Sequence, residues 1–395
     1  MLTSLGLILL FGLLFANLFQ RLRLPPIIGM LVAGVFIGPV AFNLLDSQTL
    51  AVSADLRRIA LIVILLKAGL TLNLSDLKKV GRPAILLAFL PASFELLAYY
   101  LFAPILLGIN QIEALLMGAV LAAVSPAVVV PRMVHMIENG IGTEKQIPQI
   151  ILAGASCDDI FVLVLFSTFT SMAQGHAVSV FSFLQIPISI FLGLAIGALL
   201  GLVLAKVWKW LTKRQKHMTG TYKVILLLAL SFMLMGIENS LQGHVPFSGL
   251  LAVVSMAAAL KLKSPQGLIA NLSDQMGKVW QAAEIVLFVL VGAAVDVRYT
   301  LEAGLMAVIL IFGALLIRTF GVILSLQGTS LTVKEKLFCV IAYLPKATVQ
   351  AAIGSVPLSL GLESGPIILA VAVLGILITA PLGAIGIDYS YKKLL

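Results

Sequence analysis

The stretch GASCDDIFVLVLF, residues 154–166, places two adjacent carboxylates, Asp158 and Asp159, inside an apolar segment that runs from about residue 147 to residue 172. A segment of that length can span the hydrocarbon core of a bilayer. Ionisable side chains at membrane depth are costly and are usually retained for function, although one of them could simply pin helices through a salt bridge. We interpret the pair as a site that binds a cation and a proton in turn, as in a secondary transporter.

The composition of the whole chain indicates a membrane protein. Of its 395 residues, 61% are hydrophobic and 11% are charged, which is unlike a soluble globular domain. The net charge is +9, but the basic residues flank apolar spans, so it reflects membrane topology and not nucleic-acid binding. We therefore predict an all-α polytopic membrane protein whose first helix is retained and not cleaved as a signal peptide.

About 13 apolar spans can be counted, and their flanking charges predict the orientation. Twenty of the 26 lysines and arginines fall in connectors after odd-numbered spans or at the C-terminus, and three fall in connectors on the other side. The positive-inside rule then places the N-terminus outside and the C-terminus in the cytoplasm. The most basic connector, residues 206–223, is interpreted as a topology anchor, with contact to anionic lipid headgroups as the alternative.

Two of the predicted spans are interrupted by proline, one in AAVSPAVVVPRM (122–133) and one in AYLPKATVQAAIGSVPL (342–358). The residues that mark the two breaks are Ser125, Pro126, Pro345 and Thr348. Proline removes a helical hydrogen bond, and non-helical backbone at membrane depth persists only where it is buried in protein or lines a cavity. Two interrupted spans in matching positions indicate a transporter built from repeats.

The spacing around the two breaks predicts an inverted repeat. Asp159 follows Pro126 by 33 residues, and the same step from Pro345 reaches Ile378, beside Thr379. Spans 4–6 and spans 11–13 share this layout, and their starts are seven spans apart, an odd number, so the two triplets have opposite topology. The crossing of the broken helices should place half-helix ends of both signs beside the acid pair.

Among the other charges within predicted spans, three are interpreted as charge compensation: Glu95, Arg318 and Lys346. Glu95 and Arg318 occupy equivalent spans and could form a structural ion pair, with a direct transport role for Glu95 as the alternative. Arg318 cannot release its proton, so it could pair with Glu95 or Asp158. Lys346 could neutralise a helix C-terminus or, if desolvated, titrate.

Adjacent helical positions point about 100° apart, so the two aspartates should play different roles. We expect one to face a cavity and bind the ion, and the other to be held by a partner. A buried carboxylate is neutralised by a proton or by a hard cation, but by one at a time, and this competition produces coupled antiport. Carboxylate oxygens together with carbonyls freed by the breaks suit Na⁺ or Li⁺, and no further cofactor is predicted.

These motifs resemble the monovalent cation:proton antiporter superfamily, and within it the NHA-type sodium/proton exchangers. The matching stretches are VSPAVVVP (124–131), GASCDDI (154–160), IRTFG (317–321), LPKATVQAAIG (344–354), PIIGMLVAGVFIGP (26–39) and KAGLTLNL (67–74). The resemblance implies the sodium/proton antiporter fold, with Asp159 as the ligand for Na⁺ or Li⁺ and Asp158 as its charge-compensated neighbour. Many electrogenic relatives have lysine where this chain has Arg318, so the resemblance leaves electrogenicity open.

The resemblance also implies a homodimer that works by an elevator-like motion within membrane lipid. The implied ranges are 1–82 and 221–296 for the dimerisation scaffold, 83–175 and 297–395 for the two repeats of the core transport domain, and 176–220 for a linker helix with the basic loop. The expected location is a bacterial inner (plasma) membrane, with a role in pH homeostasis.

Four other functions compete with Na⁺/H⁺ exchange. K⁺/H⁺ antiport is the main alternative, and a carrier of organic anions would need polar or basic pocket residues in place of an acid pair. A channel fits an inverted repeat less well. An intramembrane aspartyl protease needs aspartates from two helices and a GxGD motif that the chain lacks. We therefore predict a transporter and not an enzyme.

Overall fold

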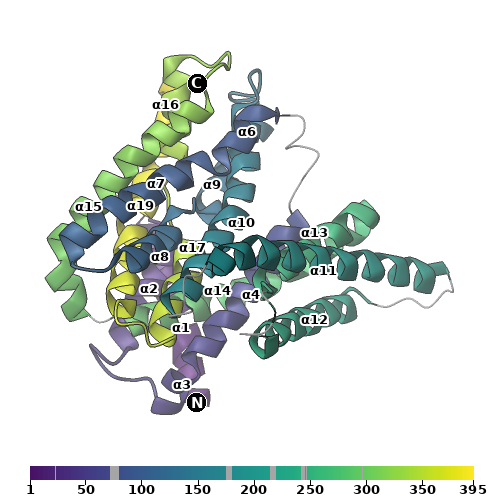
Figure 1. The fold of residues 1–395 in the computed structure, drawn as a ribbon, viewed down its shortest axis with the longest axis horizontal. Helices are drawn as coiled ribbons and strands as arrows, with labels where there is room; N and C mark the ends of the chain where they lie inside the picture. Colours follow the sequence, from purple (N-terminus) through teal and green to yellow (C-terminus); the bar gives the residue numbers. More distant parts are fainter. Residues whose placement is uncertain are drawn as a thin grey trace. The chain divides into compact units, whose positions relative to one another are not determined.

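The computed structural model describes residues 1–22, 24–71, 80–174, 180–213, 219–241, 245, 247–295 and 297–395, and it is helical with no strand among these residues (Figure 1). Three stretches named above lie outside the described residues: 72–74 of the KAGLTLNL motif, 176–179 of the expected linker and 214–218 of the basic connector.

The helices follow one another along the chain. They are α1 (Leu2–Arg21), α2 (Pro26–Ile37), α3 (Ser47–Ala51), α4 (Ser53–Thr71), α6 (Arg82–Leu87), α7 (Leu90–Leu107), α8 (Gln111–Ala122), α9 (Pro126–Glu138), α10 (Ile147–Ala173), α11 (Val180–Lys213), α12 (Gly220–Leu241), α13 (Gly249–Lys263), α14 (Gln266–Ala294), α15 (Val297–Ser325), α16 (Val333–Ala342), α17 (Thr348–Gly354), α18 (Val356–Ser359) and α19 (Gly365–Leu394).

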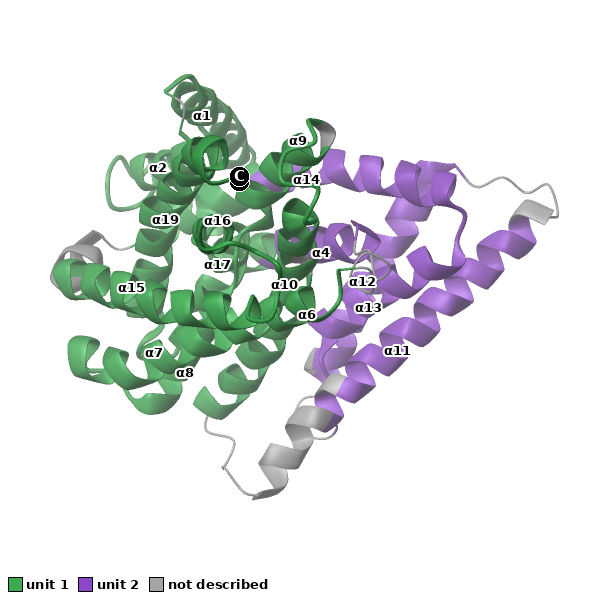
Figure 2. Ribbon diagram, turned by 90° about the horizontal axis from the view of Figure 1, so that it is seen from above, with its two compact units in different colours: residues 1–57, 73–174, 285–395 green, residues 58–72, 175–284 purple. Residues whose placement is uncertain are grey.

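These helices form two compact units, which Figure 2 shows in different colours. Unit 1 comprises residues 1–57, 73–174 and 285–395, and unit 2 comprises residues 58–72 and 175–284. Within unit 2, α13 packs against both α11 and α12. Both proline-marked breaks fall in unit 1, together with α1 and α2. The division into a core and a dimerisation scaffold stays a prediction.

Nine described helical segments are long and apolar enough to cross a membrane. The other four predicted spans correspond to α2, α4, α13 and the α16–α17 pair, which are helical but are too short, too charged or interrupted to meet the same criterion. The number of 13 spans is therefore not confirmed.

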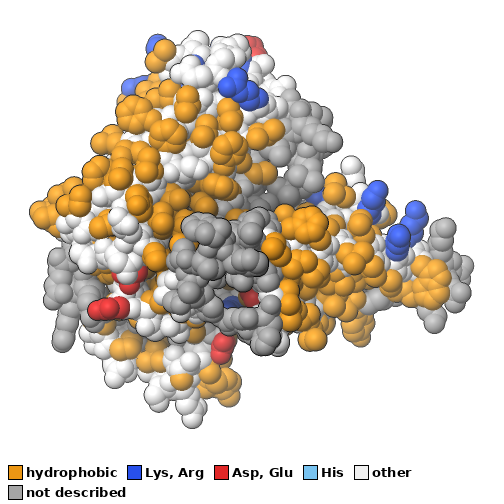
Figure 3. Space-filling view, in the orientation of Figure 1, with side chains coloured by type: hydrophobic (Ala, Val, Ile, Leu, Met, Phe, Trp, Pro, Cys, Tyr) orange, Lys and Arg blue, Asp and Glu red, His pale blue; other side chains and the backbone are white. Residues whose placement is uncertain are grey.

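Large apolar side chains are exposed on the outer helices, as expected for surfaces that face lipid. Leu14 of α1 is 56% exposed, and Leu316 and Phe320 of α15 are 67% and 64% exposed. Figure 3 shows hydrophobic side chains over much of one face of the molecule, with few charged ones between them.

The helices that carry the acid pair and its neighbours are held together within unit 1. α7 is capped at its C-terminus by Gly108, whose left-handed backbone (φ +69°) favours glycine. The N-terminus of α8 is capped by a capping box formed by Asn110 and Glu113. α8 then packs against both α7 and α10, and α7 runs alongside α15 (Figure 1). This packing brings four predicted spans to one place.

Candidate functional site

The two interrupted helices meet and cross inside unit 1. Residues 123–125 separate α8 from α9, and residues 343–347 separate α16 from α17. The backbone N–H of Ser125 donates a hydrogen bond of 2.8 Å to the carbonyl oxygen of Pro345. Pro126 is the first residue of α9. The two breaks predicted from the sequence are therefore present and are bonded directly to each other.

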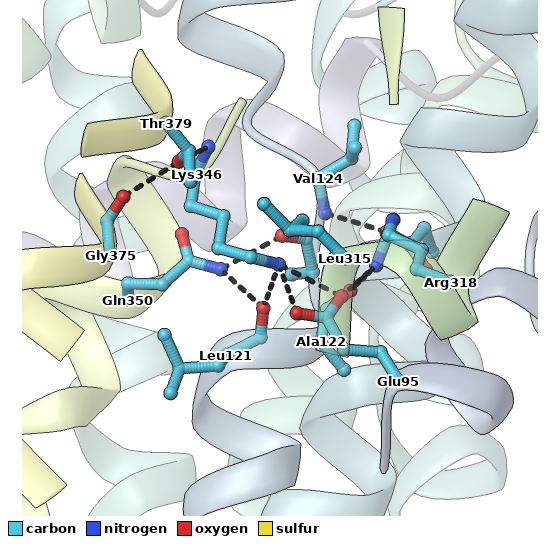
Figure 4. A network of polar contacts seen from close by, with 12 residues as sticks. Glu95, Leu121, Ala122, Val124, Leu315, Arg318, Lys346, Gln350, Gly375 and Thr379 are labelled. Atoms are coloured by element: carbon cyan, nitrogen blue, oxygen red, sulfur yellow. Dashed lines mark hydrogen bonds and ion pairs between the residues drawn. The ribbon is translucent and has the colours of Figure 1, made fainter. Parts of the chain in front are cut away.

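A buried carboxylate, Glu95 of α7, holds both of the predicted intramembrane cations (Figure 4). Arg318 of α15 donates from Nη1 to Glu95 Oε2 at 2.6 Å. The Lys346 Nζ atom lies 2.7 Å from Glu95 Oε1 and 2.9 Å from Oε2. All three side chains are at most 1% exposed. One acid therefore compensates a cation from α15 and a cation from the second break.

The same two cations also cover the C-terminal end of α8. Lys346 Nζ donates to the Leu121 carbonyl oxygen, and Arg318 Nη1 donates to the Ala122 carbonyl oxygen (Figure 4). The last carbonyls of a helix have no intrahelical partner and carry its partial negative charge, which cations stabilise. The break in the first repeat therefore exposes a negative helix end, and positive side chains of the second repeat neutralise it.

Asp158 is the held member of the acid pair. Its Oδ2 atom accepts a hydrogen bond of 2.7 Å from the Val124 N–H and lies 3.6 Å from Arg318 Nη2. The side chain is completely buried. Arg318 therefore lies against both Glu95 and Asp158, which the sequence had left as alternatives.

Asp159 is the other member of the pair, and its surroundings differ. Its side chain is half-buried, and its Oδ1 atom is sequestered without a hydrogen-bond partner among the described residues. Among the residues that the structure describes, no ion pair is formed with Asp159. Asp158 and Asp159 are thus two residues of the same type in two different electrostatic environments.

Two neutral residues complete the crossing and were not predicted as site residues. Gln350 of α17, which Figure 4 labels beside Lys346, accepts the Ala347 N–H at 2.8 Å and donates to the Ala123 carbonyl at 2.8 Å. One amide therefore serves both breaks. Thr379 of α19 accepts the Lys346 N–H at 2.9 Å. The sequence offered one signal for each of these residues. Gln350 lies inside the LPKATVQAAIG motif, and Thr379 lies one residue past the 33-residue repeat step.

Besides the Tyr343 hydroxyl, four buried oxygen atoms around the breaks have no hydrogen-bond partner among the described residues. They are Asp158 Oδ1, Asp159 Oδ1, Ser125 Oγ and Thr348 Oγ1, the last from the first residue of α17. By contrast, the freed carbonyls of Leu121, Ala122, Ala123 and Pro345 all accept protein donors. Each of these four carbonyls thus has a protein donor, and their contribution to an ion site stays a prediction. The oxygens without a partner belong to carboxylates and hydroxyls.

The sequence of these helices matches a known family over almost the whole chain. A profile described as "sodium/hydrogen exchanger, transmembrane" covers residues 6–388. The chain belongs to the sodium/hydrogen exchanger family. It is 34% identical over 385 residues to sodium/hydrogen exchanger 9B2 of Homo sapiens, an alignment that covers 94% of this chain and 70% of the relative. It is 33% identical over 387 residues to sodium/hydrogen exchanger 9B1 of Homo sapiens, covering 94% and 73%.

The fold agrees with this family assignment. The structure of the sodium proton antiporter MjNhaP1 from Methanocaldococcus jannaschii at pH 8 superimposes with a TM-score of 0.82 and 22% identity, covering 100% of this chain and 98% of that one. The sequence-based resemblance and the fold class, a multi-pass all-α membrane protein with the antiporter fold, are confirmed. Members of the family are antiporters and not enzymes, and they transport Na⁺ and H⁺ without a cofactor.

Proposed function

We propose that this chain exchanges Na⁺, or Li⁺, for H⁺ by alternating access, and that cation and proton compete for Asp159. The observation that carries the proposal is the difference between the two aspartates. Asp158 is held by the Val124 N–H and lies 3.6 Å from Arg318, whereas Asp159 is half-buried with an oxygen that no described group engages.

The coupling follows from the cost of an uncompensated charge. An ionised carboxylate in a dry interior is very unfavourable unless it is paired. Asp159 becomes neutral when it takes up a proton, and it becomes paired when it binds a cation. The domain that carries it crosses readily in either loaded form and poorly when empty, so inward movement of one ion is tied to outward movement of the other.

The ligand set favours a small hard cation. The unengaged oxygens of Asp158, Asp159, Ser125 and Thr348 are carboxylates and hydroxyls, which suit Na⁺ or Li⁺. An organic anion would need an uncompensated positive charge, but Arg318 and Lys346 are both paired with Glu95. These contacts support cation exchange over anion transport.

A proteoliposome assay with an imposed pH gradient tests the proposal. Na⁺, Li⁺ and K⁺ are added in turn, and proton movement is followed with a pH-sensitive dye. We expect Na⁺- or Li⁺-driven proton movement in the wild type and none in Asp159→Asn. The matched control is Asp274→Asn, at a carboxylate that is 65% exposed in an i,i+4 ion pair with Lys278. Exchange that persists in Asp159→Asn would remove the ion-ligand role, and exchange driven by K⁺ alone would change the substrate.

We also propose a homodimer in a plasma membrane, surrounded by lipid, with the N-terminus outside and the C-terminus in the cytoplasm. The distribution of lysine and arginine between connectors supports the orientation. The exposed apolar surface of α1 and α15 suits contact with lipid or with a second copy. Native mass spectrometry of the purified protein, together with labelling of engineered terminal cysteines from one side of a vesicle, tests both points.

A further inference from the structure

A buried aromatic residue, Tyr343, stands where α16 stops and the second break begins. It caps the C-terminus of α16 and directly precedes the non-helical residues 344–347, which include Lys346. Its side chain is completely buried in an apolar cluster that includes Ile151 and Ala155 of α10. Tyr343 therefore connects the helix of the acid pair to the break of the second repeat.

The ring of Tyr343 supports the guanidinium group of Arg318. The Arg318 Cζ atom lies 5.7 Å from the ring centroid, within the range of a cation–π contact. Arg318 Nε and Nη2 have no hydrogen-bond partner among the described residues. The aromatic face therefore limits the position of the guanidinium on a side that hydrogen bonds leave free, and it keeps the group between Glu95 and Asp158.

The hydroxyl of Tyr343 lies against α10 at a position where there is no side chain. A Cβ atom added at Gly154 would overlap this hydroxyl. Gly154 precedes Asp158 by one helical turn, so both lie on one face of α10. Neither the Tyr343 hydroxyl nor Asp158 Oδ1 has a hydrogen-bond partner among the described residues. A buried hydroxyl without a hydrogen-bond partner destabilises a protein. The stability of this conformation therefore does not explain why residue 343 carries a hydroxyl.

We propose that Tyr343 is a positioning residue for exchange. Its ring holds Arg318 between the two carboxylates, and its hydroxyl, which lies against Gly154 one helical turn before Asp158, donates to Asp158 during the transport cycle. Because the charge of Asp158 acts directly on its neighbour Asp159, the hydroxyl sets how strongly the site holds a cation. The inference rests on the proposed role of Asp159 and deepens it.

The test compares two tyrosine-to-phenylalanine variants in the proteoliposome assay. Tyr343→Phe removes the hydroxyl and keeps the ring. Tyr99→Phe is the matched control, since Tyr99 of α7 is also fully buried with an unpartnered hydroxyl but has no described ring contact with Arg318. We expect Tyr343→Phe to change the Na⁺ half-saturation by roughly fivefold, the worth of one hydrogen bond, with an unfolding temperature that is unchanged or higher. Tyr99→Phe should keep the wild-type transport values.

Two outcomes would overturn the inference. One is a Tyr343→Phe variant with wild-type half-saturation and maximal rate. The other is a parallel fall of transport and unfolding temperature in both phenylalanine variants, which would indicate general packing. Tyr343→Leu, which also removes the ring, should lower transport more than Tyr343→Phe does, and equal transport would remove the role of the ring. A wild type that moves no protons would overturn the proposed function, whereas an active wild type with an unaffected Tyr343→Phe overturns this inference alone.

Discussion

At the scale of single residues, the site contains one acid, Glu95, that pairs with two cations, and another, Asp159, that has no ion pair among the described residues. Glu95 takes both Arg318 and Lys346, and Arg318 reaches on towards Asp158. This arrangement places the positive charge of the site on the side of Asp158. Asp159, the next residue along α10, has no such partner among the described residues, and we propose that it is the carboxylate whose charge state changes.

Replacing Arg318 tests how much of this arrangement is structural. Arg318→Ala leaves the Ala122 carbonyl without its donor and Asp158 without its cation, so we expect a loss of about 3–5 kcal/mol in the free energy of unfolding. Thermal unfolding in detergent measures the loss. The control is Arg132→Ala, since Arg132 pairs with Asp388, whose side chain is 55% exposed, and such a pair contributes at most about 1 kcal/mol. A stable Arg318→Ala variant that has lost exchange would give Arg318 a transport role instead.

The sequence revealed the charged residues of the site but not the neutral ones. Glu95, Arg318 and Lys346 stand out because a charge inside an apolar span is costly and therefore rare. Gln350 and Thr379 do not stand out, because neutral polar side chains are common in membrane helices. Their partners are backbone groups at the two breaks, and those groups can be identified only once the crossing is known.

At the scale of elements, the two broken helices behave as one hydrogen-bonded unit. The Ser125 N–H reaches Pro345, the Gln350 amide reaches Ala123, and the Lys346 N–H reaches Thr379. Backbone groups that proline leaves unpaired in one repeat are thus satisfied by the other repeat or by α19. The predicted crossing is therefore a hydrogen-bonded network that links the two breaks.

Gln350→Leu should open this network. The substitution leaves the Ala347 N–H and the Ala123 carbonyl without these partners, and each buried unsatisfied group costs about 1–3 kcal/mol. We expect a lower unfolding temperature and faster hydrogen–deuterium exchange at the Ala347 amide. The control is Gln48→Leu on the exposed surface of α3, which should change neither. Unchanged exchange at Ala347 in the Gln350 variant would show that the bridge is not needed.

A second link between the repeats predicts a dependence on acid. Lys145, in the connector before α10, donates to both carboxylate oxygens of Glu335 at 2.9 Å in the first turn of α16. Burial raises the pKa of Glu335, but hydrogen bonds from Lys145 and Thr332 outweigh it and hold this pKa below its usual range. A depressed pKa stabilises the fold fully above the unfolded value of about 4.3, and this stabilisation is lost as the pH falls through the folded value.

The corresponding measurement is the unfolding temperature of the wild type and of Glu335→Gln across a pH series. Above about pH 5 the wild type should be the more stable of the two, because the carboxylate is ionised in both folded and unfolded chains. Below about pH 4 the difference should shrink as Glu335 takes up a proton. A difference that does not vary with pH would show that the ion pair contributes nothing.

At the scale of the whole molecule, the sequence predicted the class and the pair of interrupted helices but not the number of spans. Apolar length identifies a span only when the helix is long and carries few charges. α2 has 12 residues, α13 has 15, and α4 carries Arg57, Arg58 and Lys67. Whether such helices cross a membrane depends on the helices that pack against them. Arg57, for example, is buried in unit 1, with its Nη1 atom 3.5 Å from the Leu290 carbonyl oxygen. The amino-acid composition of α4 alone does not predict that contact.

The charge balance of unit 1 leads to a prediction about the transport cycle as a whole. Glu95 and Asp158 together offset Arg318 and Lys346, so these four side chains sum to zero. Arg318 keeps its proton at all accessible pH values. The Lys346 ammonium group has three oxygen acceptors, two on Glu95 and one on Leu121, and these contacts stabilise its charged form in this conformation.

Under the proposed function, Asp159 is then the one carboxylate of this set that changes its proton occupancy, and we predict that each cycle exchanges one Na⁺ or Li⁺ for one H⁺. The net charge moved is zero, so the exchange rate should not depend on the membrane potential. Proteoliposomes with the potential clamped by a K⁺ gradient and an ionophore measure this directly, with the same pH gradient at each potential. Equal initial rates are expected at zero and at strongly negative internal potential. A rate that rises steadily with the potential would mean that a second proton is carried, and Lys346 would be the group to replace first, because Arg318 cannot release one.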